Sequence, residues 1–345
     1  MKILICGNMG YIGPILVQHL KKKNFTLYGF DTGFFASCLM DTTFLPEVYL
    51  KKQYFGDVRH LPDEIFDGMD AVVYLSAISN DPMGKAFEKV TGDINAECAI
   101  LAATKAKKAG VKNFVFASSC SMYGYAEGGA RTEKDELNPL TAYARSKVAA
   151  EKGLQPLADN NFTITCLRFA TACGFSPRIR LDLVLNDFVA GAITSGKIEI
   201  LSDGTPWRPL IHVKDMSRAI EWASTRSSDN GGEYLAVNAG SNEWNYQVKE
   251  LAEAVAKVIP NTTVTVNPDA APDKRSYKVS FDLFKSLAPD YTPQVSLEQA
   301  VKDIAEGLEK AKFSDANFRE SEYIRLVKLN RLKEAGLLNE NLEWI

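Results

Sequence analysis

The chain has 345 residues, of which 46% are hydrophobic and 24% are charged, and its formal net charge is −3. This balance provides no basic footprint, so neither nucleic acid nor an anionic membrane is expected as a partner. No segment approaches the roughly 20 apolar residues that span a bilayer, and the apolar run at the N-terminus is too short for a signal sequence.

The first half of the chain alternates short apolar runs with longer helical patterns. Buried strands are expected at Lys2–Cys6, Phe25–Phe30, Ala71–Leu75, Asn113–Ala117 and Phe162–Leu167. Helices are expected between them, at Tyr11–Lys23, Lys85–Ala109 and Ala142–Ala158. This alternation predicts a Rossmann-type, doubly wound α/β fold, in which helices cover both faces of a parallel sheet.

After about Ser176 the pattern loosens, and turns rich in proline and glycine separate the elements. We expect helices at Asp182–Thr194, Lys214–Thr225, Tyr246–Val258, Leu297–Lys310 and Arg319–Ala335, and a strand that returns to the sheet at Tyr234–Val237. Residues 1–175 are therefore expected to form the Rossmann domain, to which residues 205–240 return. Residues 176–345 would form mostly a smaller, discontinuous substrate-binding lobe with a C-terminal helical extension.

Cysteine and histidine usage indicates the compartment. The six cysteines are scattered without a C-x-x-C pair, and the chain has three histidines. Reduced thiols in a cytoplasmic protein, with no metal site, are the expectation.

A glycine-rich turn follows the first strand directly, as Gly7-Asn-Met-Gly10-Tyr11-Ile12-Gly13, and leads into a helix. Gly7 would make the tight turn, and Gly10 would let the backbone approach a pyrophosphate. Gly13 would allow close packing of helix and strand, and the helix N-terminus would favour the negative charge. The turn predicts a dinucleotide site.

Asp31 ends the second strand 18 residues after Gly13, where a carboxylate would accept hydrogen bonds from the adenosine ribose. The alternative is a turn or capping aspartate. No arginine follows among Thr32, Gly33 and Phe34 to pair with a 2′-phosphate, so NAD is favoured over NADP. Further expected contacts are Asp57 and Val58 at the adenine, and Leu75, Ser76 and Ala77 beside the phosphates.

Tyr143 and Lys147 stand four residues apart in an expected helix, so they share a helix face. A free tyrosine, with a pKa of about 10, is a poor base at neutral pH. A neighbouring ammonium favours the phenolate and lowers that pKa. We therefore expect the pair to move a proton on or off a substrate hydroxyl near neutral pH.

Five motifs follow one another along the chain. They are the glycine turn, Gly56-Asp-Val-Arg59, Ser118-Ser119, the pair Tyr143 and Lys147, and the run from Asp203 to Asp215. In these motifs the chain resembles the extended short-chain dehydrogenase/reductase family, in its nucleotide-sugar epimerase, dehydratase and reductase branch. The resemblance implies that Tyr143 is the acid/base for a sugar hydroxyl and that Ser119 hydrogen-bonds the same hydroxyl. It implies that Lys147 binds the nicotinamide ribose, and that the other cofactor contacts include Ser118 and Asn95.

Cys120 and Ser121 stand where the 4,6-dehydratases of this family usually carry Asp and Glu, which makes 4,6-dehydration a poor fit. The family's GDP-fucose synthases use a cysteine at the position of Cys120 for C3/C5 epimerisation, together with a histidine that this chain lacks. Cys120 is therefore either a small buried residue or a catalytic proton-transfer group. Thr171 replaces the asparagine of the family's R-x-x-N-x-Y-G-P pattern, which weakens the match to galactose-type 4-epimerases.

Cations suited to a diphosphate lie in the second lobe. By the resemblance, Arg208 and Arg275 bind the substrate pyrophosphate, Asn186 bonds the substrate phosphates, and Ser121 contacts the sugar. Arg178 and Arg180 either contribute or are solvated surface charges. His212 is expected to be structural, and Trp207 either stacks on the base or packs internally.

The leading hypothesis is an NAD-dependent enzyme that transfers hydride at a sugar hydroxyl of a nucleotide-diphosphate hexose. C4 is the favoured position of that hydroxyl. A 4-epimerase or 4-ketoreductase is favoured over a dehydrogenase, and C3/C5 epimerisation and reduction through Cys120 is an alternative. An enzyme acting on an apolar alcohol and a non-catalytic dinucleotide-sensing regulator are further alternatives. The resemblance also implies a homodimer that pairs the helices Lys85–Ala109 and Ala142–Ala158.

Overall fold

The computed structural model describes residues 1–40, 43, 45–126, 128–266 and 276–345. Its described residues form a seven-stranded sheet in the order β10-β6-β5-β4-β1-β2-β3, with every neighbouring pair parallel. The strands are β1 (Lys2–Cys6), β2 (Thr26–Asp31), β3 (Lys52–Phe55), β4 (Ala71–Tyr74), β5 (Asn113–Ser119), β6 (Thr163–Phe169) and β10 (Tyr234–Ala239). The five strands expected in the first half and the returning strand β10 are confirmed. The edge strand β3 was not expected, because its half-exposed residues form no apolar run.

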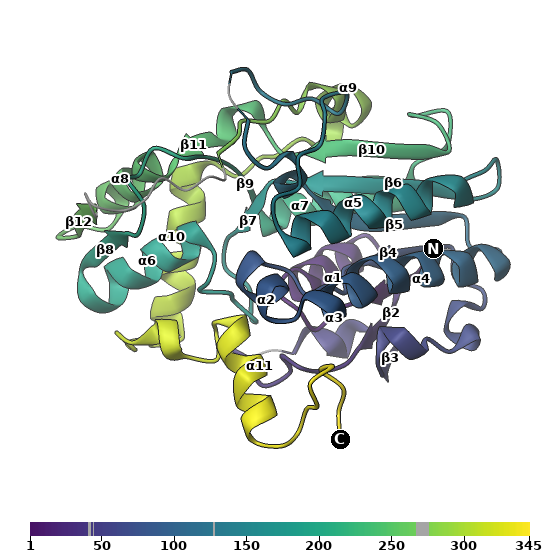
Figure 1. Cartoon of the computed structure of the whole chain (residues 1–345), viewed down its shortest axis with the longest axis horizontal. Helices are drawn as coiled ribbons and strands as arrows, with labels where there is room; N and C mark the ends of the chain where they lie inside the picture. The colour runs from purple at the N-terminus through teal and green to yellow at the C-terminus, as the bar shows by residue number, and fades with distance from the viewer. Residues whose placement is uncertain (41–42, 44, 127, 267–275) are drawn as a thin grey trace.

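Helices cover both faces of this sheet (Figure 1). α1 (Gly13–Lys22) and α7 (Val213–Thr225) pack on one face, and α4 (Cys98–Lys108) and α5 (Ala142–Leu154) pack on the other. Consecutive side chains of a strand point to opposite faces. Ile3 and Ile5 of β1 therefore join one hydrophobic core, whereas Leu4 joins the other. The predicted doubly wound Rossmann-type fold is confirmed.

The second lobe lies beyond the carboxyl ends of the strands (Figure 1). It contains two small sheets, one of β11, β9 and β7 and one of β12 and β8. Their bounds are β7 (Thr171–Cys173), β8 (Lys197–Ile200), β9 (Trp207–His212), β11 (Asn245–Gln247) and β12 (Thr263–Val266). The helices are α6 (Val184–Ser195), α8 (Val248–Val258), α9 (Asp282–Leu287), α10 (Leu297–Lys310) and α11 (Arg325–Glu334). In the described part of the chain, no helix is long and apolar enough to cross a membrane.

The prediction of one long helix over Lys85–Ala109 is wrong, because the segment is divided into shorter elements. The segment forms α2 (Asp81–Ala86), α3 (Glu88–Gly92), a π-helical turn at Asp93–Glu97 and then α4. Phe87 interrupts the helix with φ −130° and ψ 54°. The π-helical turn contains Asn95, whose side chain bonds both main-chain groups of Ile78. π-bulges of this kind occur mostly where a helix must place a particular side chain.

Two further helices end earlier or begin later than expected. The helix expected over Ala142–Ala158 ends at Leu154 and continues as a short 3₁₀ turn around Pro156, because proline cannot continue the hydrogen-bond ladder. The helix expected from Arg319 begins only at Arg325, since Ile324 has an extended backbone. This late start brings the N-terminus of α11 to a cleft described below.

A buried ion pair ties β6 to α5. The guanidinium of Arg168 donates to Glu151 through Nη2, at 2.7 Å, and through Nε, at 3.0 Å. Both side chains are less than a tenth exposed, and Ser118 of β5 donates to the same carboxylate at 2.6 Å. The pair therefore fixes β5 and β6 relative to the helix that carries Tyr143.

Removing one partner of this pair leaves an uncompensated buried charge. We expect Arg168→Met to lower the free energy of unfolding by about 3 kcal/mol, measured by urea denaturation. The control is Arg145→Gln, which breaks the exposed pair with Glu88 and should change it by less than about 1 kcal/mol. Equal effects of the two substitutions would contradict this account of the pair.

Candidate functional site

A cleft of about 880 Å³ opens at the carboxyl ends of the sheet strands and extends to the second lobe. It begins between β1 and β4, where the strand order reverses, which is the usual ligand position in open α/β sheets. Its volume lies within the range of about 300–1,000 Å³ that ligand pockets have. No cluster of side chains suited to a metal ion occurs among the described residues.

The glycine turn forms one wall of this cleft. Gly7 has a φ of +88°, and a Cβ there would lie 2.6 Å from the backbone nitrogen of Ser76. Gly13 packs behind the wall, where a Cβ would lie 2.0 Å from the carbonyl oxygen of Asn8. The turn residues Gly7, Gly10, Tyr11 and Ile12 line the cleft. The backbone can therefore approach a ligand as closely as a pyrophosphate site requires.

Asp31 is held at the end of β2 by two backbone donors. Its carboxylate accepts from the N–H of Met9, at 2.9 Å, and from the N–H of Gly33, at 2.8 Å. Burial raises the pKa of Asp31, and these two hydrogen bonds lower it. A carboxylate has about four acceptor positions, so two stay available for ribose hydroxyls. Asp31 and Val58 both line the cleft, and these residues fit the adenosine end of NAD.

Asp57 is not among the residues that line the cleft, so its expected contact with adenine stays a prediction. Both of its carboxylate oxygens accept from the guanidinium of Arg59, at 2.9 and 2.5 Å. One of them also accepts from the N–H of Arg59 at 2.8 Å and caps the following 3₁₀ turn. The charge of Asp57 is therefore neutralised by Arg59 of the same loop.

The segment after β4 forms the next part of the wall, through Leu75, Ser76 and Ala77. Asn95 lies behind this segment, fully buried, and its amide bonds the N–H and C=O of Ile78 and the hydroxyl of Ser146. These bonds position the wall, and the expected contact of Asn95 with the cofactor stays a prediction. Ser118 lines the cleft but donates its hydroxyl to Glu151.

Ser119, Tyr143 and Lys147 converge on the cleft from β5 and α5. The ammonium of Lys147 donates to the carbonyl oxygen of Ala117 at 2.7 Å and lies 5.6 Å from the centre of the Tyr143 ring. Ser119 donates to the hydroxyl of Ser121 at 2.9 Å. The three residue types needed for proton transfer at a hydroxyl are thus together.

The expected lowering of the Tyr143 pKa by Lys147 is corrected. Burial raises the pKa of Tyr143, although a hydrogen bond with Ser119 and the charge of Arg180 lower it. Burial also lowers the pKa of Lys147 to about 7, because the charged ammonium is poorly solvated there. Desolvation therefore dominates the pair, and it favours the neutral form of both groups.

Cys120 lies outside the cleft and is fully buried. Its thiol donates to the carbonyl oxygen of Arg168 at 3.0 Å, and burial raises its pKa. A raised pKa gives the thiol little thiolate character, so it is a poor base. These observations favour the alternative of a small buried residue, and a catalytic role for Cys120 stays a prediction.

Two of the expected substrate contacts, Ser121 and Arg208, line the cleft. Arg208 donates to the carbonyl oxygen of Trp207 at 2.9 Å. Arg275 lies outside the described residues. Of the two arginines left open, Arg180 lines the cleft and pairs with Asp182.

Arg178, by contrast, is buried against Glu47 and does not line the cleft. Trp207 does not line it either, and Lys278 lies 3.8 Å from the centre of its indole ring, so the packing interpretation holds.

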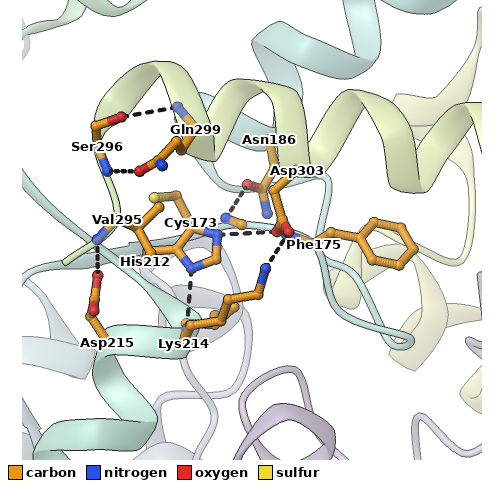
Figure 2. A network of polar contacts seen from close by, with 12 residues as sticks. Cys173, Phe175, Asn186, His212, Lys214, Asp215, Val295, Ser296, Gln299 and Asp303 are labelled. Atoms are coloured by element: carbon orange, nitrogen blue, oxygen red, sulfur yellow. Dashed lines mark hydrogen bonds and ion pairs between the residues drawn. The ribbon is translucent and has the colours of Figure 1, made fainter. Parts of the chain in front are cut away.

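Asn186 and His212 belong to an internal network (Figure 2). Asn186 is fully buried; its amide accepts from the N–H of Gly174 and donates to the carbonyl oxygen of Arg180. Its amide is thus used within the protein, and its expected contact with substrate phosphates stays a prediction. His212 bonds Asp303 at 3.1 Å and accepts from the N–H of Lys214, so it joins β9, α7 and α10 as the structural residue that was predicted.

Several residues of the cleft wall were not predicted. They are Phe34 and Phe35 after β2, and Arg319, Ile324 and Arg325 from the C-terminal segment. The aromatic pair directly after Asp31 was a detectable local signal. The C-terminal residues gave none, because only the fold brings them to the cleft.

Comparisons with known proteins agree with this geometry. A model described as the NAD dependent epimerase/dehydratase family matches residues 3–240. The UDP-glucose 4-epimerase of Pasteurella multocida is 28% identical over 345 residues, which cover 88% of this chain and 96% of that protein. Over 90% of this chain and 99% of the other, the fold matches a UDP-glucose-4-epimerase structure from Stenotrophomonas maltophila with bound NAD, at a TM-score of 0.78 and 19% identity. It also matches the NDP-hexosamine 5,6-dehydratase TunA, with a TM-score of 0.77 at 20% identity, over 92% of this chain and 99% of that one.

Proposed function

The chain belongs to the NAD-dependent epimerase/dehydratase family, and we propose that it acts at C4 of a nucleotide-diphosphate hexose, as a 4-epimerase or 4-ketoreductase. The observation that carries the proposal is the convergence of Ser119, Tyr143 and Lys147 on the cleft that the glycine turn and Asp31 begin. The sugar 4-epimerases among its relatives favour C4.

In this proposal Tyr143 exchanges a proton with the sugar hydroxyl, and Ser119 orients that hydroxyl by a hydrogen bond. Bound NAD would accept the hydride and return it in a 4-epimerase, whereas NADH taken up from solution would donate it in a 4-ketoreductase. Lys147 contacts the nicotinamide ribose from the same helix face as Tyr143. Binding of substrate excludes water from the pair, which strengthens each of these electrostatic contacts.

Arg208, Arg180 and Arg275 are proposed to face the diphosphate of the substrate. A guanidinium presents two parallel N–H donors to phosphate oxygens, which suits it to this task. The expected division of labour also stands as a proposal: residues 1–175 with the return of 205–240 bind the cofactor, and the rest mostly binds the sugar nucleotide.

Two other reactions fit less well. For 4,6-dehydration the chain lacks the acid and base, because Cys120 and Ser121 stand where the family's dehydratases usually carry Asp and Glu. Epimerisation at C3 and C5 through Cys120 lacks a thiol that reaches the cleft. Oxidation by a dehydrogenase uses the same three residues and is separated from epimerisation only by whether NADH is released.

The purified protein should therefore convert UDP-, GDP- or dTDP-hexoses into their C4 epimers, or reduce the corresponding 4-keto sugars. The assay combines chromatography of the product with nicotinamide absorbance, which shows whether NADH is released. Tyr143→Phe is the matched control, since it retains the ring and removes only the hydroxyl. Release of NADH with an oxidised sugar would favour the dehydrogenase, and no turnover of any of these sugars would sink the proposal.

We also propose a homodimer formed through α4 and α5. The two helices lie side by side on one face of the sheet (Figure 1). Leu101 of α4 and Ala149 of α5 are exposed. Apolar residues on neighbouring exposed helices are a usual basis for a symmetric interface. Sedimentation should show a dimer at micromolar concentration, and Leu101→Glu should shift it toward the monomer.

A further inference from the structure

Arg325 has a buried guanidinium with no acidic partner among the described residues. It is the first residue of α11, its residue is 1% exposed, and it lines the cleft. Its Nη2 donates to the carbonyl oxygen of Arg178 at 2.7 Å, whereas its Nη1 is buried without a hydrogen-bond partner. Buried charges are normally paired, so this group needs an explanation.

The surrounding charges do not supply a partner. Two arginines close to it, Arg178 behind the cleft and Arg180 in its wall, pair with the carboxylates of Glu47 and Asp182. Burial, and to a smaller extent the charges of Arg180 and Arg178, lower the pKa of Arg325 to about 10, so it remains a cation at neutral pH. The three guanidinium groups therefore exceed these two carboxylates by one charge.

The helix that begins at Arg325 adds to the positive potential. α11 has no acidic residue in its first turn and no side-chain cap at Ile324. The N-terminus of a helix carries a partial positive charge, which disfavours a cation and favours an anion. A cation at this end of the helix, facing a cleft, is therefore suited to binding an anion.

The position of Arg325 indicates which anion. The guanidinium lies 4.5 Å from the centre of the Phe35 ring, four residues after Asp31, and Phe35 lines the cleft as well. The same loop is covered by the C-terminal tail, where Trp344 donates to the carbonyl oxygen of Thr32 and its ring lies 5.6 Å from that of Phe34. Arg325 thus reaches the cleft beside the adenosine half of the dinucleotide site.

We propose that Arg325 binds a nucleotide diphosphate in this cleft, and that the diphosphate is that of the dinucleotide cofactor. This inference rests on the proposed assignment of the cleft to NAD and a sugar nucleotide. It extends that assignment beyond residues 3–240, the part of the chain that the family model matches. Arg325 would then complete the cofactor site from the far end of the chain.

The test compares Arg325→Gln, Arg325→Lys and the control Arg331→Gln, an exposed arginine of the same helix. Calorimetry on dinucleotide-free protein measures the Kd values of ADP, adenosine and UDP. Arg325→Gln should raise the Kd of ADP on the order of tenfold and leave that of adenosine unchanged, because a hydrogen-bonded charge is lost only for the phosphates. The Kd of ADP for Arg325→Lys should lie between those of the wild type and Arg325→Gln. The Kd for the control Arg331→Gln should equal that of the wild type.

The other outcomes are also decisive. A raised Kd for UDP with an unchanged Kd for ADP would keep the diphosphate site but assign it to the substrate, whereas no change in either would overturn the inference. A purely structural arginine predicts that the unliganded Arg325→Gln protein is less stable, and our proposal predicts equal or greater stability in urea. If Arg325→Gln does not fold, Arg325→Lys carries the comparison. None of these readouts needs sugar turnover, so failure of the proposed reaction would be seen separately.

Discussion

Tyr143→Phe is expected to lower kcat by about 10²- to 10⁴-fold, the usual contribution of a positioned acid or base. The substitution removes one oxygen atom from a half-buried ring and leaves the ring's packing beside Lys147 intact. The amount of NAD that the protein binds and its unfolding midpoint in urea should therefore stay close to the wild type. Turnover of the sugar nucleotide and NAD content, measured on the same preparation, check both statements.

Tyr123→Phe is the matched control for this prediction. Tyr123 is also buried near the end of β5, and its hydroxyl bonds Asn238 at 2.8 Å, but it does not line the cleft. Its loss should cost stability and leave kcat within a small factor. If Tyr143→Phe kept most of the wild-type kcat, proton transfer by Tyr143 would be excluded, and the regulator hypothesis would regain its place.

Local motifs predicted that the glycine turn and Asp31 lie together, and both line one cleft, because a few consecutive residues determine each. The turn from Gly7 to Gly13 needs only a strand before it and a helix after it. Asp31 needs only to end the neighbouring strand. Both conditions are properties of short segments and of the parallel order that strand–helix alternation imposes.

The sequence was less informative where the direction of a side chain decides its use. Ser119 and Cys120 are adjacent, yet Ser119 lines the cleft and Cys120 is buried behind it. Strand β5 ends at Ser119 and a 3₁₀ turn begins at Cys120, so the alternation of side chains along a strand could not have predicted this. Asn186 and Asp57 matched expected positions, but their polar atoms are bound within the protein by partners that no spacing reveals.

Arg325 shows a second limit of prediction from sequence. Its neighbours Phe35 and Arg178 are far from it along the chain, and the helix pattern around it predicted a start at Arg319. Whether a cation is solvated or buried without a partner depends on all the elements packed around it. The same holds for the pKa values of Tyr143 and Lys147, where burial outweighs the attraction that their spacing suggested.

Lys147→Met is expected to lower kcat on the order of a hundredfold, because in the proposed function Lys147 contacts the nicotinamide ribose beside Tyr143. It should do so without lowering the free energy of unfolding of the dinucleotide-free protein near neutral pH. The ammonium is 2% exposed, so its burial disfavours the folded state, and methionine fills a similar volume without a charge. Activity and stability should therefore respond differently to the same substitution.

The contribution of Lys147 to the free energy of unfolding should depend on pH, and its sign follows from the two pKa values of this lysine. Lys147 loses its proton near pH 7 in the folded protein, whereas an unfolded lysine keeps it up to about 10.5. Between these values the unfolded state binds more protons, so this group makes the protein more stable as the pH rises, by up to about 1.4 kcal/mol per pH unit. Below pH 7 both states are protonated, and the penalty is constant.

The measurement is the difference in free energy of unfolding between wild type and Lys147→Met across this pH range. All other titrating groups, including the buried cysteines, are common to both proteins, so the difference isolates Lys147. The wild type should gain on the variant as the pH rises above about 7. A difference that is flat or that falls with pH would mean that Lys147 stays charged in the folded protein, and a permanently charged ammonium would then stabilise the Tyr143 phenolate as its spacing first suggested.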